Sequence, residues 1–269
     1  MVHEHRGVVN QVWHVHFSHR AGVTIKIAPR WFAGSLPREA KCLRLLHDKG
    51  VAVPRVLCVI PAQEDPLRGH DLLVMTTITG TTLRDADLTL GTLSQLLRPY
   101  HQLHQTAVPG YGWFSQDLTG NHQTWRSFLL DLEEEPQVAM NPPWPNRRAS
   151  VSHLLSDVPE PGAARLLYGD YNRDNFILQP DGTVFALDFQ NCFAGDPLYD
   201  WATVLLKEPK KTQYLHKVLR LTSSGRRHVA AYQARVLWNM IAYYATCDLA
   251  HSHNLGRKLD HLLATTSWR

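Results

Sequence analysis

The fold is decided by two stretches, LLYGDYNRDNFIL at residues 166–178 and FALDFQNCFAGDPLYDWA at residues 185–202. In the first, Asp170 and Asn175 lie on a loop between two short apolar strands, and in the second Asp188 ends another such strand. Buried strands would anchor these loops and bring two carboxylates and a carboxamide together. Mg²⁺ takes oxygen ligands, few of them protein carboxylates, and completes its shell with phosphate oxygens and water. The remaining carboxylate can orient an attacking hydroxyl, so the pattern favours phosphoryl transfer.

The same stretches resemble the catalytic machinery of the aminoglycoside phosphotransferase and choline kinase superfamily, relatives of the protein kinases. Residues 168–175, Tyr-Gly-Asp-x4-Asn, are similar to the catalytic loop of that family, and residues 187–190, Leu-Asp-Phe-Gln, to its metal-binding motif. Residues 195–202, Gly-Asp-Pro-x2-Asp-Trp-Ala, resemble the helix start that follows. We interpret Asp196 and Asp200 in this third motif as structural, because aspartate caps the free amides of a helix start.

The resemblance implies a role for each polar residue of the first two motifs. Asp170 would be the catalytic base, and Asn175 and Asp188 would hold Mg²⁺. Two positions depart from the family: Tyr168 replaces its usual histidine, and Gln190 stands where it usually has glutamate or another polar residue. Neither change removes the base or a metal ligand, and we expect Tyr168 to pack and hydrogen-bond in place of the histidine.

Matches to the family continue toward the N-terminus in the family's order. Lys26 lies in an apolar strand, at the position that pairs nucleotide phosphates, and Glu39 matches the helix glutamate that steadies this lysine. The plain alternatives are a lysine on an exposed strand face and a solvent-facing glutamate. Residues 50–54, Gly-x3-Pro, resemble the turn to the next strand, and residues 103–104, Leu-His, the helix that supports the catalytic loop.

Two segments would contact the nucleotide. The turn RGVVNQVW has a single glycine, Gly7, where protein kinases have a glycine-rich loop, and Asn10 and Gln11 are side-chain donors beside it. The segment LVMTTITG resembles the hinge between lobes, where Thr76 and Ile78 would meet the adenine. No Walker A pattern occurs, which argues against a P-loop nucleotidase.

Apolar periodicity divides the chain into a strand-rich first part and a helical second part. The first part predicts strands at 8–17, 23–28, 55–60 and 71–78 and a helix at 37–49. The second predicts helices at 93–106, 124–135 and 229–250, strands at 165–168, 175–178 and 183–189, and a surface loop at 141–146. This order implies an α+β, two-lobed protein-kinase-like fold, with a nucleotide-binding N-lobe of residues 1–79 and a catalytic C-lobe of residues 80–269.

The composition makes other classes of protein improbable. The 269 residues are 44% hydrophobic, and the net charge of +4 is spread without a basic stripe, so nothing argues for nucleic-acid binding. The four cysteines form no CxxC and suit reduced, buried thiols, and the histidines lack the spacing of a zinc site. There is no signal-like start and no apolar run of ~20 residues. We therefore expect a soluble cytoplasmic protein, a monomer or homodimer, that binds no membrane.

Together these features predict a kinase that transfers the γ-phosphoryl group of ATP or GTP to a hydroxyl of a small acceptor, such as an aminoglycoside or other antibiotic, an amino alcohol or a sugar. A protein kinase is disfavoured because no long activation segment separates Asp188 from Gly195. The competing class is a kinase-like module that binds nucleotide without transfer.

The acceptor pocket has two sets of candidate residues. Acidic residues would suit a cationic acceptor, and the candidates are Asp117, Asp131 and Glu133–Glu135, although a solvated helix face is the more usual reason for the run at 131–135. Six aromatic residues would either line the pocket or belong to the core: Trp125, Trp144, Trp201, Trp238, Tyr243 and Tyr244.

Overall fold

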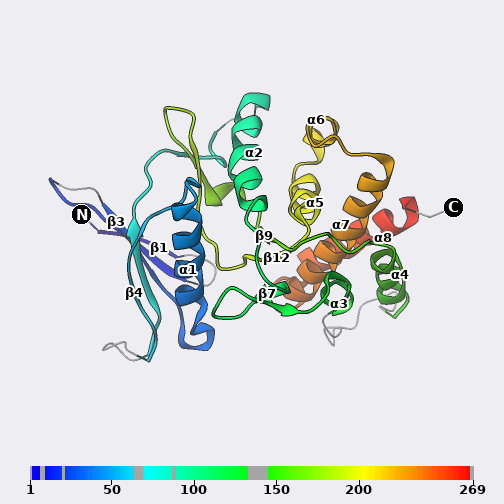
Figure 1. The fold of residues 1–269 in the computed structure, drawn as a ribbon, viewed down its shortest axis with the longest axis horizontal. Helices are drawn as coiled ribbons and strands as arrows, with labels where there is room; N and C mark the ends of the chain where they lie inside the picture. Colours follow the sequence, from blue (N-terminus) through cyan, green and yellow to red (C-terminus); the bar gives the residue numbers. More distant parts are fainter. Residues whose placement is uncertain are drawn as a thin grey trace.

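A five-stranded antiparallel sheet and one long helix form the N-terminal lobe. The computed structural model describes residues 2–6, 10–19, 22–63, 69–86, 89–132 and 145–266. The sheet has the order β1-β2-β3-β5-β4, and α1 packs against β4 and β5 (Figure 1). These elements are β1 (Val2–Arg6), β2 (Gln11–Val15), β3 (Val23–Ile27), α1 (Ser35–Asp48), β4 (Val56–Ile60) and β5 (Leu72–Thr76).

The central strand β3 alternates between buried and half-buried residues. Its two polar members, Thr24 and Lys26, are buried, and they share one face because successive side chains of a strand point to opposite sides. That face is turned toward α1, where Lys26 finds a carboxylate partner. The prediction of a strand at 23–28 is confirmed, and the exposed-face alternative for Lys26 is wrong.

The helix α1 forms because its apolar residues recur at helical spacing. It begins at Ser35, two residues before the predicted start, directly after Gly34 in the left-handed region at φ 88°. It ends as predicted before Gly50, whose φ of 72° turns the chain while its amide donates to the His47 carbonyl. The buried apolar residues of α1 are Leu36, Ala40, Cys42, Leu43 and Leu46.

Helices dominate the C-terminal lobe, as the sequence predicted (Figure 1). The α-helices are α2 (Leu90–His104), α3 (Trp125–Leu130), α4 (Pro145–Ser156), α5 (Pro197–Lys207), α6 (Thr212–Val218), α7 (Ser223–Ala245) and α8 (Leu249–Thr265). Three short 3-10 helices are η1 (Arg30–Phe32), η2 (Arg173–Asn175) and η3 (Pro209–Lys211). The two-lobed α+β fold is thereby confirmed.

Two small sheets frame the loops that carry the sequence motifs. One has the order β11-β10-β6 and the other β8-β7-β12-β9. The chain passes from β9 through the first motif to β10, and from β11 through the second motif to β12, so both motif loops run from one sheet to the other. The strands are β6 (Thr81–Thr82), β7 (Tyr111–Phe114), β8 (Gly120–His122), β9 (Arg165–Leu167), β10 (Phe176–Leu178), β11 (Val184–Ala186) and β12 (Phe193–Gly195).

Several predicted boundaries are wrong. The single helix expected at 229–250 is a pair, because α7 stops at Ala245 and Asp248 begins α8 by accepting a hydrogen bond from the His251 amide at 3.0 Å. The helix expected at 124–135 ends at Leu130. The loop expected at 141–146 overlaps α4, since proline suits a first helical turn.

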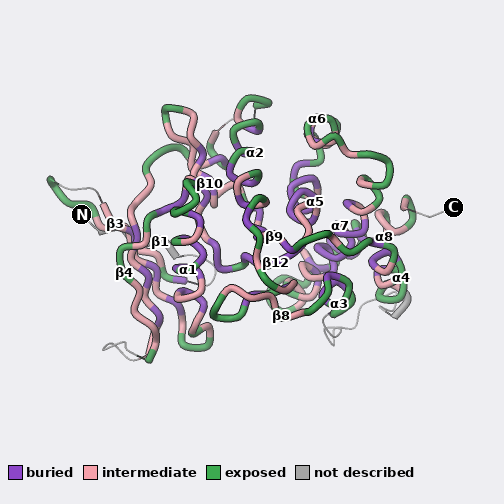
Figure 2. Tube along the Cα trace, in the orientation of Figure 1, coloured by how far each residue is buried: buried purple, intermediate pink, exposed green. Residues whose placement is uncertain are grey.

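An aromatic cluster around Trp125 forms the centre of the C-terminal lobe. In Figure 2 much of the chain along α5 and α7 is coloured as buried. Trp125 Nε1 donates to the Tyr232 hydroxyl at 2.8 Å, and that hydroxyl donates to Asp196 Oδ2 at 2.7 Å. Asp196 also accepts from the Leu198 amide and caps α5, with Pro197 in the first turn. The structural role predicted for Asp196 is confirmed. The rings that surround Trp125 belong to Phe128, Phe193, Tyr199 and Tyr232.

The cysteines are all free thiols, but only two are buried. Cys42 and Cys192 lie in the core, whereas Cys58 and Cys247 are exposed, so the expectation of four buried thiols is half wrong. Within the described residues, none of the helices combines the length and the apolar character that crossing a membrane requires.

Candidate active site

A buried lysine, Lys26, joins the two lobes through two carboxylates. Its Nζ donates to Glu39 Oε1 on α1 at 2.7 Å and to Asp188 Oδ1 at 3.0 Å. Burial by itself would lower the pKa of Lys26, but the two carboxylates outweigh it and raise the pKa, so the ammonium stays charged. The structure thus brings together three residues that the sequence carries in separate motifs, and Glu39 is fully buried rather than solvent-facing.

Asp188 adopts a left-handed backbone conformation, with φ at 56°. This region is sparsely populated by residues other than glycine, and aspartate and asparagine tolerate it best. The turn lets the next amide, that of Phe189, donate to Glu39 Oε1 at 3.1 Å. The Asp188 side chain remains 39% exposed, so its second oxygen can meet a ligand while the first holds Lys26.

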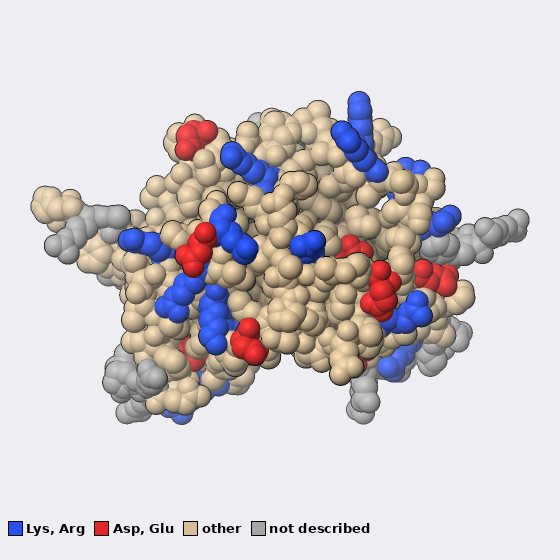
Figure 3. Space-filling model, in the orientation of Figure 1, with Lys and Arg blue, Asp and Glu red and all other residues tan. Residues whose placement is uncertain are grey.

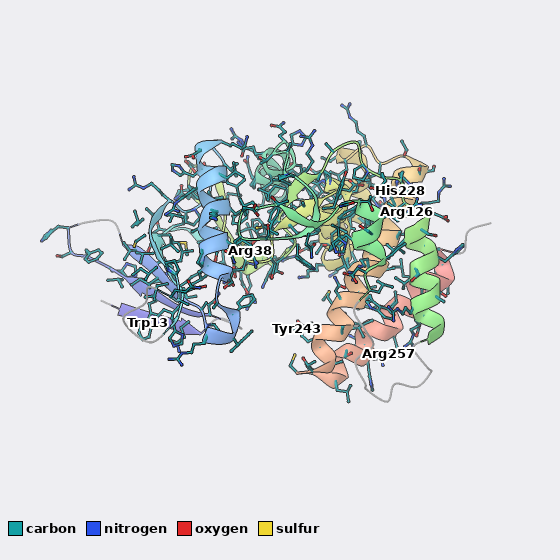
Figure 4. All side chains as sticks on the ribbon, turned by 60° about the horizontal axis from the view of Figure 1, so that its bottom comes forward. Trp13, Arg38, Arg126, His228, Tyr243 and Arg257 are labelled. Atoms are coloured by element: carbon teal, nitrogen blue, oxygen red, sulfur yellow. The ribbon has the colours of Figure 1, made fainter. Side chains whose placement is uncertain are left out.

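The loop of residues 188–191 connects α1 with the rest of the site. Gln190 accepts from Asn10 Nδ2 at 2.6 Å and donates to Ser35 Oγ at 3.2 Å. Arg38 reaches from α1 toward the C-terminal lobe (Figure 4) and donates to the carbonyls of Phe114 and Gln190. Gln190, one of the two departures from the family pattern, therefore helps to join the lobes.

A single carboxylate, Asp200 on α5, holds the start of the catalytic loop. It accepts the amides of Tyr168 at 2.8 Å and Gly169 at 2.9 Å, and His104 Nε2 donates to it at 2.9 Å from the end of α2. Asp200 is 2% exposed. The structural interpretation of Asp200 and the supporting position of residues 103–104 are both confirmed.

Asp170 follows this anchored segment and has a neighbour on either side. Asn191 Nδ2 donates to its Oδ2 at 3.1 Å, and Lys207 Nζ lies 4.0 Å from its Oδ1. The Asp170 side chain is 37% exposed. It is therefore fixed in direction by Asn191 and still accessible from outside.

Tyr168 and Asn175 lie at the two ends of this loop and support it through hydrogen bonds. Tyr168 is buried, and its hydroxyl donates to the Leu187 carbonyl at 2.5 Å, one residue before Asp188. Burial, together with Asp188 and Asp170, raises the pKa of Tyr168, while a hydrogen bond from Asn175 acts in the opposite direction, as a donor does. The expected packing and hydrogen bonding of Tyr168 are confirmed.

The oxygen atoms at this point suit a hard divalent cation. If the Asn175 amide nitrogen donates to Tyr168, its carbonyl oxygen is left to serve as a ligand. The Leu187 amide donates to the Asn175 backbone carbonyl at 2.8 Å, which ties this residue to the start of the Asp188 turn. One carboxamide oxygen and one partly exposed carboxylate match the protein share of a Mg²⁺ shell that phosphates and water complete.

The residues predicted to contact the nucleotide differ in whether their polar groups are already hydrogen-bonded within the protein. Ile78 lies beyond β5, and its backbone groups form no hydrogen bond to the described residues. Thr76 is instead a strand residue whose amide donates to the Arg55 carbonyl and whose hydroxyl accepts from the Arg55 amide. Asn10 is buried, with its amide nitrogen on Gln190, and Gly7 lies outside the described residues.

The residues predicted for the acceptor pocket differ in their exposure: some are buried in the core and others are exposed. Three tryptophans, Trp125, Trp201 and Trp238, are buried core residues, while Trp144 and Glu133–Glu135 lie outside the described residues. The remaining acidic candidates, Asp117 and Asp131, are exposed. Tyr243 is 51% exposed at the end of α7 (Figure 4). Burial raises the pKa of Tyr244, whose ring lies edge-on against that of Tyr243.

Charged side chains are scattered over the molecular face drawn in Figure 3. Lysine and arginine alternate with acidic and neutral surface, without a continuous basic stripe on that face. This distribution agrees with the modest net charge and gives no support to nucleic-acid binding.

Two neighbours of Asp170 escaped the sequence interpretation, namely Asn191 and Lys207. Lys207 had a usable signal: it lies seven residues after Asp200, and residues seven apart share one face of a helix. Asn191 had none, because its role depends on the turn at Asp188.

The comparisons with known proteins agree with this geometry. Among solved structures, the chain resembles aminoglycoside phosphotransferase APH(4)-Ia, with a TM-score of 0.78 and 16% identity over 100% of this chain and 94% of that chain. It also resembles choline kinase LicA from Streptococcus pneumoniae, with a TM-score of 0.71 and 18% identity over 98% and 94%. At such identities the likeness shows the fold. No curated protein matches by sequence.

A family model supplies the stronger finding. The model described as the phosphotransferase enzyme family matches residues 5–235, most of the chain. Its span includes both motif loops, Lys26 and Glu39. The resemblance inferred from the motifs is confirmed, and the chain belongs to the phosphotransferase enzyme family.

Proposed function

We propose that the chain is a small-molecule kinase that transfers the γ-phosphoryl group of ATP or GTP to a hydroxyl group of a small acceptor. The observation that carries the proposal is the convergence of Lys26, Glu39 and Asp188 beside a braced, partly exposed Asp170. This arrangement offers a charged contact for phosphate, oxygen ligands for a metal and a base for a hydroxyl, which are the parts that phosphoryl transfer needs.

The nucleotide would bind between the lobes, which we place at residues 1–79 and 80–269. The free backbone groups of Ile78 suit the hydrogen-bonding edge of a purine. Lys26 would contact phosphate oxygens, and Glu39 would keep its ammonium pointed at them. A buried, paired lysine loses little freedom when it binds, so its contact is preorganised.

Asp188 and Asn175 would hold Mg²⁺, which neutralises charge on the phosphates when bound. Asp170 would orient the acceptor hydroxyl. In the transfer, the acceptor oxygen bonds to the γ-phosphorus, and the bond from that phosphorus to the β–γ bridging oxygen breaks. Its electron pair leaves with the nucleoside diphosphate, and the hydroxyl proton passes to Asp170.

The end of α7 would form one wall of the acceptor site, because α7 packs against α5, the helix that anchors the loop of Asp170. A thermostable mutant of APH(4)-Ia has been solved in a ternary complex with AMP-PNP and hygromycin B. That protein supports a nucleotide donor and a polyhydroxylated small-molecule acceptor for the fold. Aminoglycosides, other antibiotics, amino alcohols and sugars are therefore the acceptors to test first.

The experiment is a screen of such acceptors with γ-labelled ATP and GTP, followed by single-turnover assays of Asp170→Asn. A positioned base contributes about 10²–10⁴-fold, so the rate should fall by at least the lower factor. The affinity for Mg-ATP, measured by calorimetry, should change by less than about tenfold, because Asp170 is not proposed as a metal ligand.

Two outcomes would contradict the proposal. Wild-type transfer by the Asp170→Asn variant would remove Asp170 as the base. Nucleotide binding without transfer to any acceptor or to water would instead favour a binding module.

A further inference from the structure

The last residue of α5, Lys207, is a charged group that the mechanism above does not use. Its Nζ donates to the Tyr171 carbonyl at 2.6 Å and lies 4.0 Å from Asp170 Oδ1. Its side chain is 34% exposed, close to the value for Asp170. The two opposite charges therefore stand side by side, and both are partly exposed.

The ammonium of Lys207 is not consumed by its sequence neighbour Glu208. That carboxylate binds the Arg173 guanidinium through both oxygens and also accepts the Tyr171 hydroxyl at 2.9 Å. An ammonium has three donors. One donor of Lys207 goes to Tyr171, and the other two make no hydrogen bond to the described residues.

The geometry of transfer brings the phosphoryl group to this ammonium. An acceptor hydroxyl must lie about 2.6–3.2 Å from Asp170, and the phosphorus about 3–3.5 Å from the hydroxyl oxygen. An acceptor bound on the Lys207 side of Asp170 would bring the oxygens of the transferring group within reach of the ammonium, which is 4.0 Å from Asp170 Oδ1. In a loose transition state much of the charge lies on these equatorial oxygens.

An effect of Lys207 on Asp170 alone does not explain why a lysine lies at this position. A cation beside a carboxylate stabilises its ionised form and makes it a weaker proton acceptor. A contact with the transferring group has no such conflict, because the charge on its oxygens attracts the ammonium throughout the step.

We infer that Lys207 is a catalytic residue whose ammonium contacts the transferring phosphoryl group on its acceptor side. The inference rests on the proposed function. Lys207 exchanges no proton or covalent bond: the acceptor oxygen–phosphorus bond forms, the bridging oxygen–phosphorus bond breaks, and the proton goes to Asp170. Lys26 and Lys207 would thus hold the phosphoryl group from opposite sides.

The test compares Lys207→Gln with Lys207→Arg, using Mg-ADP with fluoroaluminate as a mimic of the transferring group in flight. Glutamine keeps an N–H donor for Tyr171 but removes the charge. We expect Lys207→Gln to lower affinity for the mimic by about 10²–10³-fold and to lower the rate of ATP hydrolysis or transfer by a similar factor. Affinity for Mg-ATP should stay within about threefold, and Lys207→Arg should recover most of the loss.

A matched control is Lys210→Gln, which removes an exposed charge three residues away in η3. It should bind the mimic as the wild type does. A merely structural Lys207 would change the melting temperature and Mg-ATP affinity along with the mimic.

The outcomes separate the two proposals. Unchanged affinity of Lys207→Gln for the mimic, with an active wild type, would overturn the role of Lys207 alone. A wild type that neither binds the mimic nor hydrolyses or transfers phosphate would overturn the proposed function and this role with it.

Discussion

At the scale of single residues, Asp188 combines three tasks in one side chain and its backbone. Its carboxylate pairs with Lys26, its left-handed φ of 56° aims the next amide at Glu39, and its exposed oxygen faces the opening. The conformation restricts the position to a few residue types, and the chemistry restricts it to a carboxylate. Asparagine satisfies the first demand and fails the second.

The variant Asp188→Asn therefore separates chemistry from folding. Asparagine adopts the left-handed region readily, so the melting temperature should change little. Turnover should fall at least about 10²-fold and Mg-ATP should bind more weakly, because a neutral amide is a poorer ligand for Mg²⁺. Calorimetry with Mg-ATP and steady-state assays measure both effects.

The control is Asp181→Asn, an exposed turn residue whose carboxylate accepts from the Thr183 amide at 2.9 Å. It should behave as the wild type. Wild-type turnover in Asp188→Asn would remove Asp188 from the metal site.

At the scale of elements, one face of α5 clamps the catalytic loop at two points. Asp200 receives the amides of Tyr168 and Gly169, and Lys207, two turns later on the same face, donates to the Tyr171 carbonyl. The helix itself starts where Asp196 caps it. The position of the loop thus follows from where this helix begins.

Removing the first clamp should affect stability and rate together. In Asp200→Ala the buried amide of Tyr168 and the half-buried amide of Gly169 lose their acceptor, at about 1–3 kcal/mol each, so the unfolding free energy should fall by about 2–6 kcal/mol. The rate should fall as well, because the base no longer has a fixed direction. Urea unfolding and single-turnover assays measure the two effects.

For comparison, Asp48→Ala removes an 82% exposed carboxylate at the end of α1 and should be nearly neutral. If Asp200→Ala were equally neutral, the hydrogen bonds of Asp200 would contribute neither to the unfolding free energy nor to the rate.

Elements with a local cause were predictable from the sequence, and elements with a distant cause were not. The strand 23–28 and the end of α1 at Gly50 follow from alternation and from glycine chemistry. The break between α7 and α8 contains neither glycine nor proline, and its cap, Asp248, looks like any helix residue until the chain has turned. The short strands β7 and β12 exist because they pair with each other, and β12 also pairs with β9, which local sequence cannot reveal.

The residues of the candidate site also divide into those that the sequence could predict and those that it could not. Motif spacing indicated Lys26, Glu39, Asp170, Asn175 and Asp188, because each motif is continuous in sequence. Thr76 was placed by analogy with a hinge, but its amide and hydroxyl are taken by Arg55 on the neighbouring chain segment. Asn10 was expected to offer its side-chain donor to the nucleotide, but its Nδ2 donates to the buried Gln190 side chain instead.

At the scale of the whole molecule, the C-terminal lobe is built around Trp125, which contacts rings from α3, β12, α5 and α7. Gly195 lets β12 pass directly beside this indole. A methyl group there would overlap the Trp125 ring and come 2.9 Å from Leu167 Cδ1. Interiors are close-packed, so neither neighbour can yield without moving others.

We expect Gly195→Ala to lower the unfolding free energy by about 1–3 kcal/mol through overpacking. Calorimetric melting of the whole chain is the measurement. Gly162→Ala is a matched control, because a methyl group at Gly162 meets no atom within 4 Å. If the two variants melted alike, the close approach at Gly195 would carry no energetic weight.

The loop of residues 188–191 gives each successive residue a different partner: Lys26, Glu39, then Asn10 and Ser35, then Asp170. In evolutionary terms such a segment can drift in residue identity after Asp188, which must remain a carboxylate, but it cannot drift in length. An exchange such as the glutamine at position 190 preserves the order of partners, as long as hydrogen-bonding capacity is kept. A single insertion or deletion would move every later residue onto the wrong partner at once. We therefore expect this loop to keep a constant length while the sequence of the surrounding surface diverges.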